Sequence, residues 1–130
     1  MNALRRLPLL LALCAGAAAA SPLDDLLQDY RSAAGTPDPE RGAAAWTRPM
    51  ATPDGDPRRC SDCHGTDLTQ AGRHLRTGKP IPPLAPSANP DALSDPDEVE
   101  KWLYRNCRWT WGRECTPREK GELILFIASH

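Results

Sequence analysis

Aromatic residues are scarce in this chain of 130 residues: they make up 5% of it, and only one of them is Phe. Proline, by contrast, occurs 14 times. A small domain with few large side chains has little apolar surface to bury, and proline interrupts helices and strands. We therefore expect a thin protein core, which a large apolar group would complete.

The sequence also lacks an apolar run long enough to cross a bilayer. Its main apolar run, residues 7–13, follows Arg5 and Arg6 and precedes three alanines at 18–20, which is the layout of a secretory signal peptide. We expect residues 1–20 to be this signal, with a periplasmic location and no membrane span after processing.

Residues 21–130 then form one small domain. Cys14 lies within the expected signal, and Leu13 before it is not the small residue that a lipoprotein signal needs. We expect Cys14 to be removed with the signal, which leaves four cysteines in the mature chain.

Neither sign of charge dominates the sequence. The chain has 16 Lys and Arg against 17 Asp and Glu. Loss of Arg5 and Arg6 with the signal would leave a net charge of about −3. Nucleic acids and anionic membrane surfaces attract basic proteins, so neither is an expected partner.

Residues 60–64, C-S-D-C-H, form the C-x-x-C-H attachment motif of a c-type haem. Two thiols three positions apart on a helical turn can each add to one vinyl group of the porphyrin. His64 is then held beneath the iron, where a neutral imidazole is a good axial ligand. The sequence therefore predicts one covalent haem c, attached through Cys60 and Cys63 and ligated by His64. A redox-active cysteine pair, or half a zinc site, is the alternative interpretation.

The other two cysteines, Cys107 and Cys115, form an even remainder in an oxidising compartment, which favours a disulfide. A four-cysteine zinc site competes with this interpretation. Zinc ribbons use two short knuckles, however, and these two cysteines are eight positions apart, so we favour the disulfide.

Helix signals occur in four further places, and no strand pattern is recognisable, so the predicted fold class is all-α. Each expected helix begins at a capping residue followed by proline, or at a proline itself. The four expected helices run from residue 22 to Gly35, from about 39 to 47, from 96 to about Cys107, and from 117 to the C-terminus. The second of these helices is expected to bury Ala43, Ala44 and Trp46.

Residues 79–96 contain six prolines, which exclude a helix or the interior of a sheet. Long loops within a compact domain are uncommon unless they have a function. Ile81, Leu84 and Leu93 give this segment apolar side chains to bury, so we expect it to lie against the haem.

The function of such a haem depends on the ligand opposite His64. A methionine ligand from the C-terminal half is excluded, because the last methionine is Met50, ahead of the motif. His74 is far enough along the chain to reach round a porphyrin, although it sits in a polar stretch where exposed histidine is common. His130, at the chain terminus, is expected to fray.

Asn106 is a further candidate for this position. Val99, Trp102, Leu103 and Asn106 fall at helical spacing, so Asn106 extends an apolar face. A buried amide needs a partner, but asparagine also commonly ends helices. From the residues alone both roles stay open. Cys107 favours ligation, because a bridge to Cys115 would fix the backbone beside the amide.

Four segments together resemble the sphaeroides haem protein (SHP) family of c-type cytochromes, over about residues 22–127. They are C-S-D-C-H-G, L-R-T-G-K-P-I-P-P-L-A-P-S-A-N-P, V-E-K-W-L-Y-R-N-C and G-R-E-C-T-P-R-E-K. The resemblance implies a class I cytochrome c-like domain, residues 21–130, around one haem. It also implies that Asn106 is the distal iron ligand and that Cys107 pairs with Cys115.

The resemblance further implies that the asparagine leaves the iron on reduction, that the haem then binds O2 or NO, and that a dihaem cytochrome c is the redox partner. The segment between Cys107 and Cys115 is bulkier than this resemblance leads us to expect. An ordinary bis-histidine electron carrier, ligated by His64 and His74, is the alternative. An enzyme would need a positioned acid–base group near Asn106; only Arg105 and Arg108 are close in sequence, so catalytic turnover is not expected.

Overall fold

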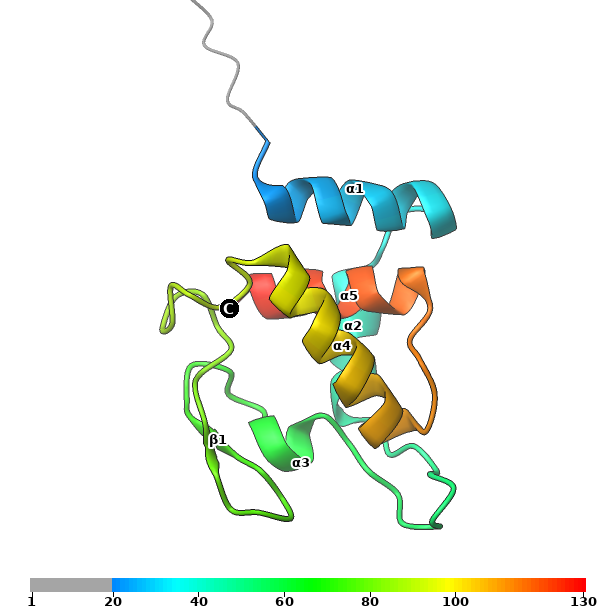
Figure 1. Cartoon of the computed structure of the whole chain (residues 1–130), viewed down its shortest axis with the longest axis vertical. Coiled ribbons are helices and arrows are strands. Elements are labelled where there is room, and N and C mark those ends of the chain that lie inside the picture. The colour runs from blue at the N-terminus through cyan, green and yellow to red at the C-terminus, as the bar shows by residue number, and fades with distance from the viewer. Residues whose placement is uncertain (1–19) are drawn as a thin grey trace, which may run out of the picture.

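The structure, a computed structural model, describes residues 20–130, in which helices dominate (Figure 1). The expected signal peptide, apart from residue 20, and Cys14 lie outside this range. The elements are helices α1 (Pro22–Ala34), α2 (Pro39–Thr47), α3 (Ser61–His64), α4 (Pro96–Trp111) and α5 (Pro117–Ala128), and strands β1 (Gly72–Arg73) and β2 (Pro80–Ile81).

The helix starts follow from capping residues. Ser21 and Asp24 form a capping box at the start of α1, and Thr116 and Glu119 form another at the start of α5. Gly35, with φ of 79°, ends α1 at the predicted position. Proline at the first position of these helices costs no hydrogen bond, because the first amides of a helix have no partner within it.

The packing of α2 against α5 is the most extensive helix contact in the described chain. Gly42 allows this approach: a Cβ atom there would lie 2.1 Å from the carbonyl oxygen of Glu122. The buried face of α2 contains Ala45 and Trp46, whereas Ala44 is exposed, so the expected inward role of Ala44 is wrong. The close approach at Gly42 determines which side of α2 faces inward.

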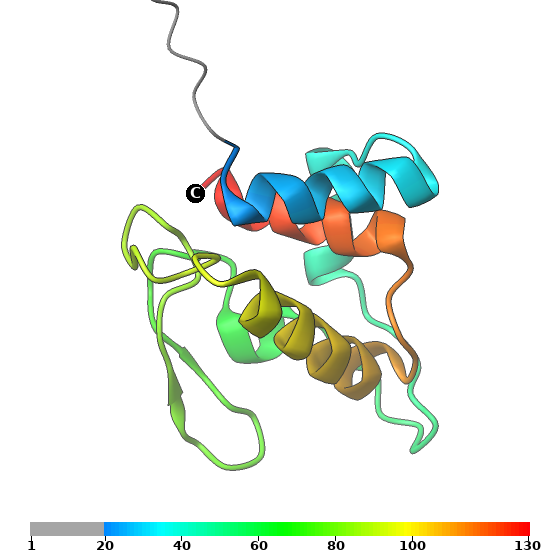
Figure 2. The same cartoon turned by 45° about the horizontal axis from the view of Figure 1, so that its top comes forward.

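Helix α1 runs beside α5, and α4 lies on the far side of this pair from α2 (Figures 1 and 2). Together α1, α2, α4 and α5 form one half of the molecule. The other half contains α3, the β1–β2 hairpin and the proline-rich loop that follows it. Within the described residues, no helix combines the length and apolarity needed to cross a bilayer.

The two strands were not predicted from the sequence. Gly72 pairs with Ile81 and Arg73 with Pro80 in an antiparallel hairpin. Two residues are too few for an alternating pattern, and Pro80 can only occupy such an edge position. This short edge pairing is consistent with the prediction that residues 79–96 form no helix and no interior strand of a sheet.

Helix α4 is one turn longer than predicted. It continues past Cys107 to Trp111 and ends at Gly112, which has φ of 68°. Glycine in the left-handed conformation is a common helix end, whereas the predicted end at about Cys107 left Trp109 and Trp111 outside the helix. The extra turn moves both tryptophans onto the helix that contains Asn106.

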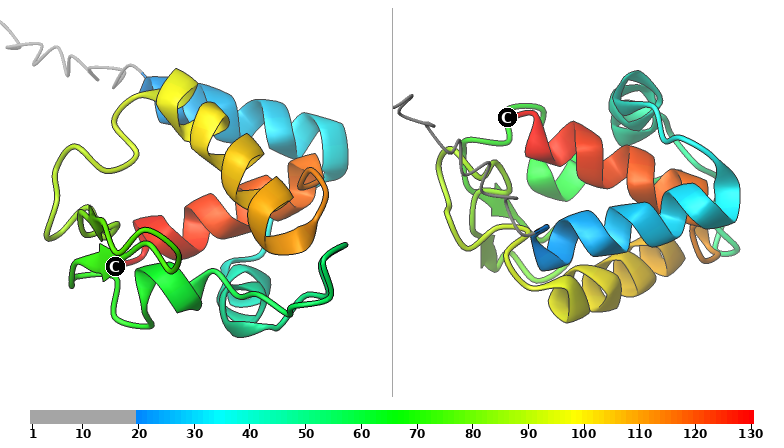
Figure 3. Two further views of the ribbon diagram at one scale, coloured as in Figure 1. Left: turned by 60° about the horizontal axis from the view of Figure 1, so that its bottom comes forward. Right: turned by 90° about the horizontal axis from the view of Figure 1, so that it is seen from above.

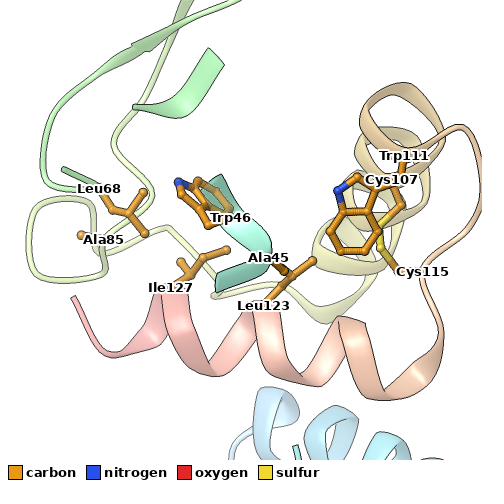
Figure 4. Close-up of a cluster of buried hydrophobic side chains, with 9 residues drawn as sticks. All are labelled: Ala45, Trp46, Leu68, Ala85, Cys107, Trp111, Cys115, Leu123 and Ile127. Atoms are coloured by element: carbon orange, nitrogen blue, oxygen red, sulfur yellow. A yellow bond between two sulfur atoms is a disulfide. The ribbon is translucent and has the colours of Figure 1, made fainter. Parts of the chain in front are cut away.

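The main core cluster lies between α2, α5 and the end of α4 (Figure 4). Trp46 and Trp111 are its largest members; Leu123 of α5 lies between them, and Ile127 of α5 lies beside Trp46. The core is thin, as the composition indicates, and one side of it forms the wall of the cavity described next.

Candidate haem site

A cavity of about 830 Å³ separates the two halves of the molecule. Helix α3 and the β1–β2 hairpin form one side of it, and α4 lies on the other (Figure 3). Leu123, Ile124 and Ile127 of α5 form its apolar floor, and the proline-rich loop closes it at the edge. This volume is in the range of sites that enclose a cofactor-sized ligand.

The C-x-x-C-H motif lies on the cavity wall. Cys60, Cys63 and His64 all line the cavity, and the His64 amide donates to the Cys60 carbonyl oxygen at 3.2 Å, which closes one helical turn. Gly72 packs against this turn: a Cβ atom there would be 2.3 Å from the Cys63 carbonyl oxygen. The two thiols and the imidazole are therefore presented to the cavity by a single short helix that the hairpin supports.

His64 is suited to bind a metal through its ring. Burial lowers the pKa of His64, which keeps the imidazole neutral and able to donate a lone pair. Its Nδ1 atom is buried and has no hydrogen-bond partner within the described part of the chain. The Trp46 ring lies 5.5 Å from the His64 ring, and the Trp46 indole donates to the Gly65 carbonyl oxygen at 2.8 Å, which ties α2 to the end of α3.

The thiols fit thioether attachment better than metal coordination. Burial raises the pKa of Cys60 to about 11, and a zinc or redox site needs a thiolate, which a lowered pKa favours. Within residues 20–130, no three His, Cys, Asp or Glu side chains converge on a possible metal position. The alternative interpretations of the motif, a zinc knuckle or a redox pair, therefore lack support in the geometry.

Asn106 lines the same cavity from α4. Val99, Trp102 and Leu103, which the helical spacing grouped with it, also line the cavity. Helices α4 and α3, which contain Asn106 and His64, border the cavity on different sides (Figure 3). The apolar face predicted from the sequence is thus directed to the cavity.

The structure contains a disulfide between Cys107 and Cys115, next to Asn106. It joins the last turn of α4 to the start of α5. Cys107 and Cys115 are both buried in the main core cluster. The backbone that presents Asn106 is therefore covalently linked to the helix that forms the cavity floor.

His74 lines the cavity too, but it belongs to the hairpin on the α3 side. Its Nδ1 accepts hydrogen bonds from the amides of Arg76 and Thr77, at 3.3 and 3.2 Å. The next residue, Leu75, has its amide 3.3 Å from the Cys63 sulfur. These contacts hold His74 beside the thioether edge of the site rather than across the cavity from His64.

The remaining sequence candidates contribute less to the site. Met50 is not among the lining residues; it pairs with Arg58 in an isolated bridge and packs against the core. His130 is not frayed as expected, since its backbone carbonyl accepts a hydrogen bond from Ser87. Arg105 lines the cavity, with its guanidinium 5.3 Å from the Trp102 ring, whereas Arg108 pairs with Glu114 at the surface.

Three residues of the last turn of α4 were missed as site residues: Trp109, Thr110 and Trp111 line the cavity. The helical spacing was the available signal, because Thr110 follows Asn106 by four positions and shares its face. Arg58 stacks 3.9 Å from the Trp109 ring and donates to the Trp109 carbonyl oxygen at 2.9 Å. These contacts connect the end of α4 to the segment that precedes the C-x-x-C-H motif.

The donor set and the shape of the cavity therefore fit a haem. The two thiols and an uncharged imidazole lie on one wall, the floor is aliphatic, and another wall offers a neutral carboxamide. A porphyrin buried in this cavity would also add apolar contacts, which the few large apolar side chains of this chain cannot provide alone.

Comparison with known proteins gives matches over most of the chain. The family described as a domain of unknown function (DUF1924) matches residues 32–127. The chain is 49% identical to "Cytochrome c-type protein SHP" of Cereibacter sphaeroides over 80% of its own length and 81% of that protein. It is 35% identical to "Cytochrome c''" of Methylophilus methylotrophus over 66% of its length and 60% of that protein.

The similarity extends to solved structures. Oxidised SHP, described as an oxygen-binding cytochrome c, superposes with a TM-score of 0.75 at 44% identity, covering 86% of this chain and 100% of that one. The crystal structure of oxidised cytochrome c'' superposes with a TM-score of 0.73 at 30% identity, covering 83% and 94%. A solution structure of cytochrome c'', presented as insight into haem-ligand detachment, gives 0.72, also at 30% identity.

Proposed function

This chain belongs to the SHP family of c-type cytochromes, and we propose that it is a periplasmic haem protein that exchanges an asparagine ligand for a diatomic gas. Residues 1–20 are the proposed export signal and residues 21–130 the haem domain. The observation that supports the proposal is that Asn106, on α4, and His64, on α3, line the same cavity from different helices.

Three residues hold the cofactor, one covalently attached haem c. Cys60 and Cys63 provide the thioether links, and His64 provides the proximal nitrogen. When bound, the haem would supply an iron that can change its charge by one electron and bind a small ligand. Aliphatic residues of α5 form the floor of the cavity, and Asn106 itself is exposed toward the open space.

Asn106 provides the redox dependence. A carboxamide is a weak, neutral and hard ligand, which ferric iron tolerates and the softer ferrous iron binds poorly. Reduction therefore favours withdrawal of the Asn106 side chain, and its place opens to O2 or NO. That related SHP is described as an oxygen-binding cytochrome c, and cytochrome c'' is discussed in terms of haem-ligand detachment, supports this proposal.

The disulfide limits how far Asn106 can move. Cys107, directly after Asn106, is tied to Cys115 and buried in the core, so the backbone of α4 cannot swing outward at this point. The displaced amide then stays close enough to donate a hydrogen bond to a gas molecule. The electron comes from a redox partner protein, which the family resemblance implies is a dihaem cytochrome c.

A bis-histidine electron carrier is the second candidate, because His74 also lines the cavity. Its contacts disfavour this role: Nδ1 accepts from two backbone amides, and the hairpin is held against Cys63. Ligation by His74 would require the hairpin to leave α3. We therefore assign His74 to the edge of the site.

Absorption spectra test the proposal. We expect the dithionite-reduced protein to be high-spin and to shift fully with carbon monoxide. Asn106→Ala should make the oxidised protein high-spin as well, whereas the matched variant His74→Ala should leave both spectra unchanged. Sharp low-spin bands in the reduced protein, indifferent to carbon monoxide and lost in His74→Ala, would instead establish the bis-histidine carrier.

A further inference from the structure

Trp111 has a buried polar group that the fold leaves without a partner. Its side chain is 4% exposed, it lines the cavity, and its indole nitrogen has no hydrogen-bond partner among the described residues. The indoles of Trp46 and Trp102 differ, since they donate to Gly65 at 2.8 Å and to Glu98 at 3.2 Å. A buried indole N–H normally finds an acceptor.

The Trp111 ring is held in this position from several sides. Cys107 and Leu123 pack with it in the core cluster, and the Arg113 guanidinium lies 5.5 Å from its ring. The next residue, Gly112, is so close to Pro53 that a Cβ atom there would lie 2.8 Å from the Pro53 Cδ. The ring is therefore not free to turn its N–H toward solvent.

The N–H edge faces the interior of the site. In Figure 4 the Trp111 nitrogen lies on the side of the ring that faces Trp46, across the cluster, rather than toward the Cys115 side. Side chains on a helix also lean toward its N-terminus, which carries the Trp111 ring back toward the turn that contains Asn106. Trp111 and Asn106 thus contribute to the same wall of the cavity.

Residues 20–130 do not provide the missing acceptor, which points to an acceptor in what the cavity holds. We propose that the Trp111 indole N–H donates a hydrogen bond to an oxygen atom in the haem cavity, from either a haem propionate or a small ligand in the place that Asn106 leaves. The inference rests on the proposed function, because both sources require haem in the cavity. A carboxylate or a polarised gas molecule gives a stronger acceptor than water would.

The direct test is the indole region of the proton–nitrogen spectrum of the full haem-loaded protein, reduced and saturated with carbon monoxide. This state is diamagnetic whether the distal position takes carbon monoxide or keeps a strong protein ligand, so the spectrum is readable in either case. Failure of the proposed function would appear in the absorption spectrum of the same sample, separately from the Trp111 signal.

We expect one indole signal to be shifted downfield and to exchange slowly with solvent, and to be the signal missing in Trp111→Phe. Tyr30→Phe is the matched control, since the Tyr30 hydroxyl is also buried without a partner but does not line the cavity. That variant should keep the shifted signal. A Trp111 signal that is unshifted in the carbon monoxide complex and exchanges as fast as that of Trp102 would exclude the propionate, because carbon monoxide is itself a poor acceptor. The proposal is overturned if dioxygen then also dissociates from Trp111→Phe as slowly as from the native protein.

Two further measurements on Trp111→Phe separate the sources of the acceptor. If it is a propionate, the reduction potential and its pH dependence should change, with dioxygen release unaffected. If it is the small ligand, dioxygen should dissociate about fivefold to tenfold faster, as for one lost hydrogen bond, while carbon monoxide, a poor acceptor, dissociates as before. If none of these quantities differs between Trp111→Phe and the native protein, the proposal is contradicted.

Discussion

At the scale of single residues, Gly72 decides whether the hairpin can support the C-x-x-C-H turn. Its backbone lies directly against Cys63 and His64, with no room for a side chain: an added Cβ atom would be 2.3 Å from one carbonyl oxygen and 2.9 Å from the His64 Cα. Both neighbours are backbone atoms, which cannot move aside without displacing the helix that presents His64.

We predict that Gly72→Ala lowers the free energy of unfolding of the haem protein by about 2 kcal/mol, in the range of overpacked sites. It should also lower the fraction of protein that carries haem. Denaturant titration and the ratio of haem to protein absorbance measure both. Gly78→Ala is the control within the same hairpin: its φ of 67° strains an alanine, but nothing lies within 4 Å of its Cβ position, so it should keep its haem. Equal haem loss in both variants would contradict this role of Gly72.

The residues of the site differ in how far the sequence could predict them. Cys60, Cys63 and His64 follow from local spacing, because a single helical turn determines their relative positions. Asn106 needed the periodicity of a whole helix together with the family resemblance. The proposed role of Trp111 was out of reach, because it depends on the core cluster that Trp111 shares with Leu123, which only the folded chain brings together.

At the scale of elements, α5 begins with an ion pair inside its capping box. The Arg113 guanidinium binds both carboxylate oxygens of Glu119 at 2.8 Å, and the Thr116 amide donates to the same carboxylate. The hydrogen bonds from Arg113 are the main cause that lowers the pKa of Glu119, from its usual 4.5 to about 2. This carboxylate thus helps to fix the start of the helix that forms the cavity floor.

A carboxyl group whose pKa is lowered by folding stabilises the fold above its unfolded value, and the contribution is lost as the pH falls from 4.5 toward about 2. We predict that Glu119→Gln costs about 1 kcal/mol at neutral pH, and that the difference from the native chain shrinks below pH 4.5. Thermal unfolding of both proteins between neutral pH and pH 3 measures this. Glu114→Gln, in an exposed pair with Arg108, should differ little at any pH, and a pH-independent Glu119 effect would refute the assignment.

The sequence predicted the starts of the long helices well and their ends less well. The starts of α1 and α5 carry a capping residue followed by proline, which are strong local signals. The end of α4 was misplaced because it depends on Gly112, whose left-handed conformation was not recognised. The β1–β2 hairpin was missed because its two-residue strands have no periodicity and are held by packing against α3.

At the scale of the whole molecule, the Cys107–Cys115 disulfide connects the distal wall of the cavity to its floor. We predict that replacing both cysteines by serine lowers the free energy of unfolding by about 2–3 kcal/mol, the value for a short closed loop. Greater freedom of α4 beside Asn106 should also speed the association of carbon monoxide with the reduced protein.

Chemical denaturation and flash photolysis measure these two effects. Mild reduction of the native chain with a thiol reagent should reproduce both, because the thioether links are not reducible in this way. Unchanged association rates in the stable double variant would show that the disulfide serves stability alone and does not restrain Asn106.

The close packing of α2 against α5 has a consequence for the order of assembly. The groove that Gly42 opens is filled only by α5, which also supplies the cavity floor through Leu123, Ile124 and Ile127. Cys60 and Cys63 precede α5 in the chain, so the pocket around these thiols is complete only after the final helix has packed. An intermediate in which α5 is undocked would therefore present an open pocket to an incoming porphyrin, and docking of α5 would close it.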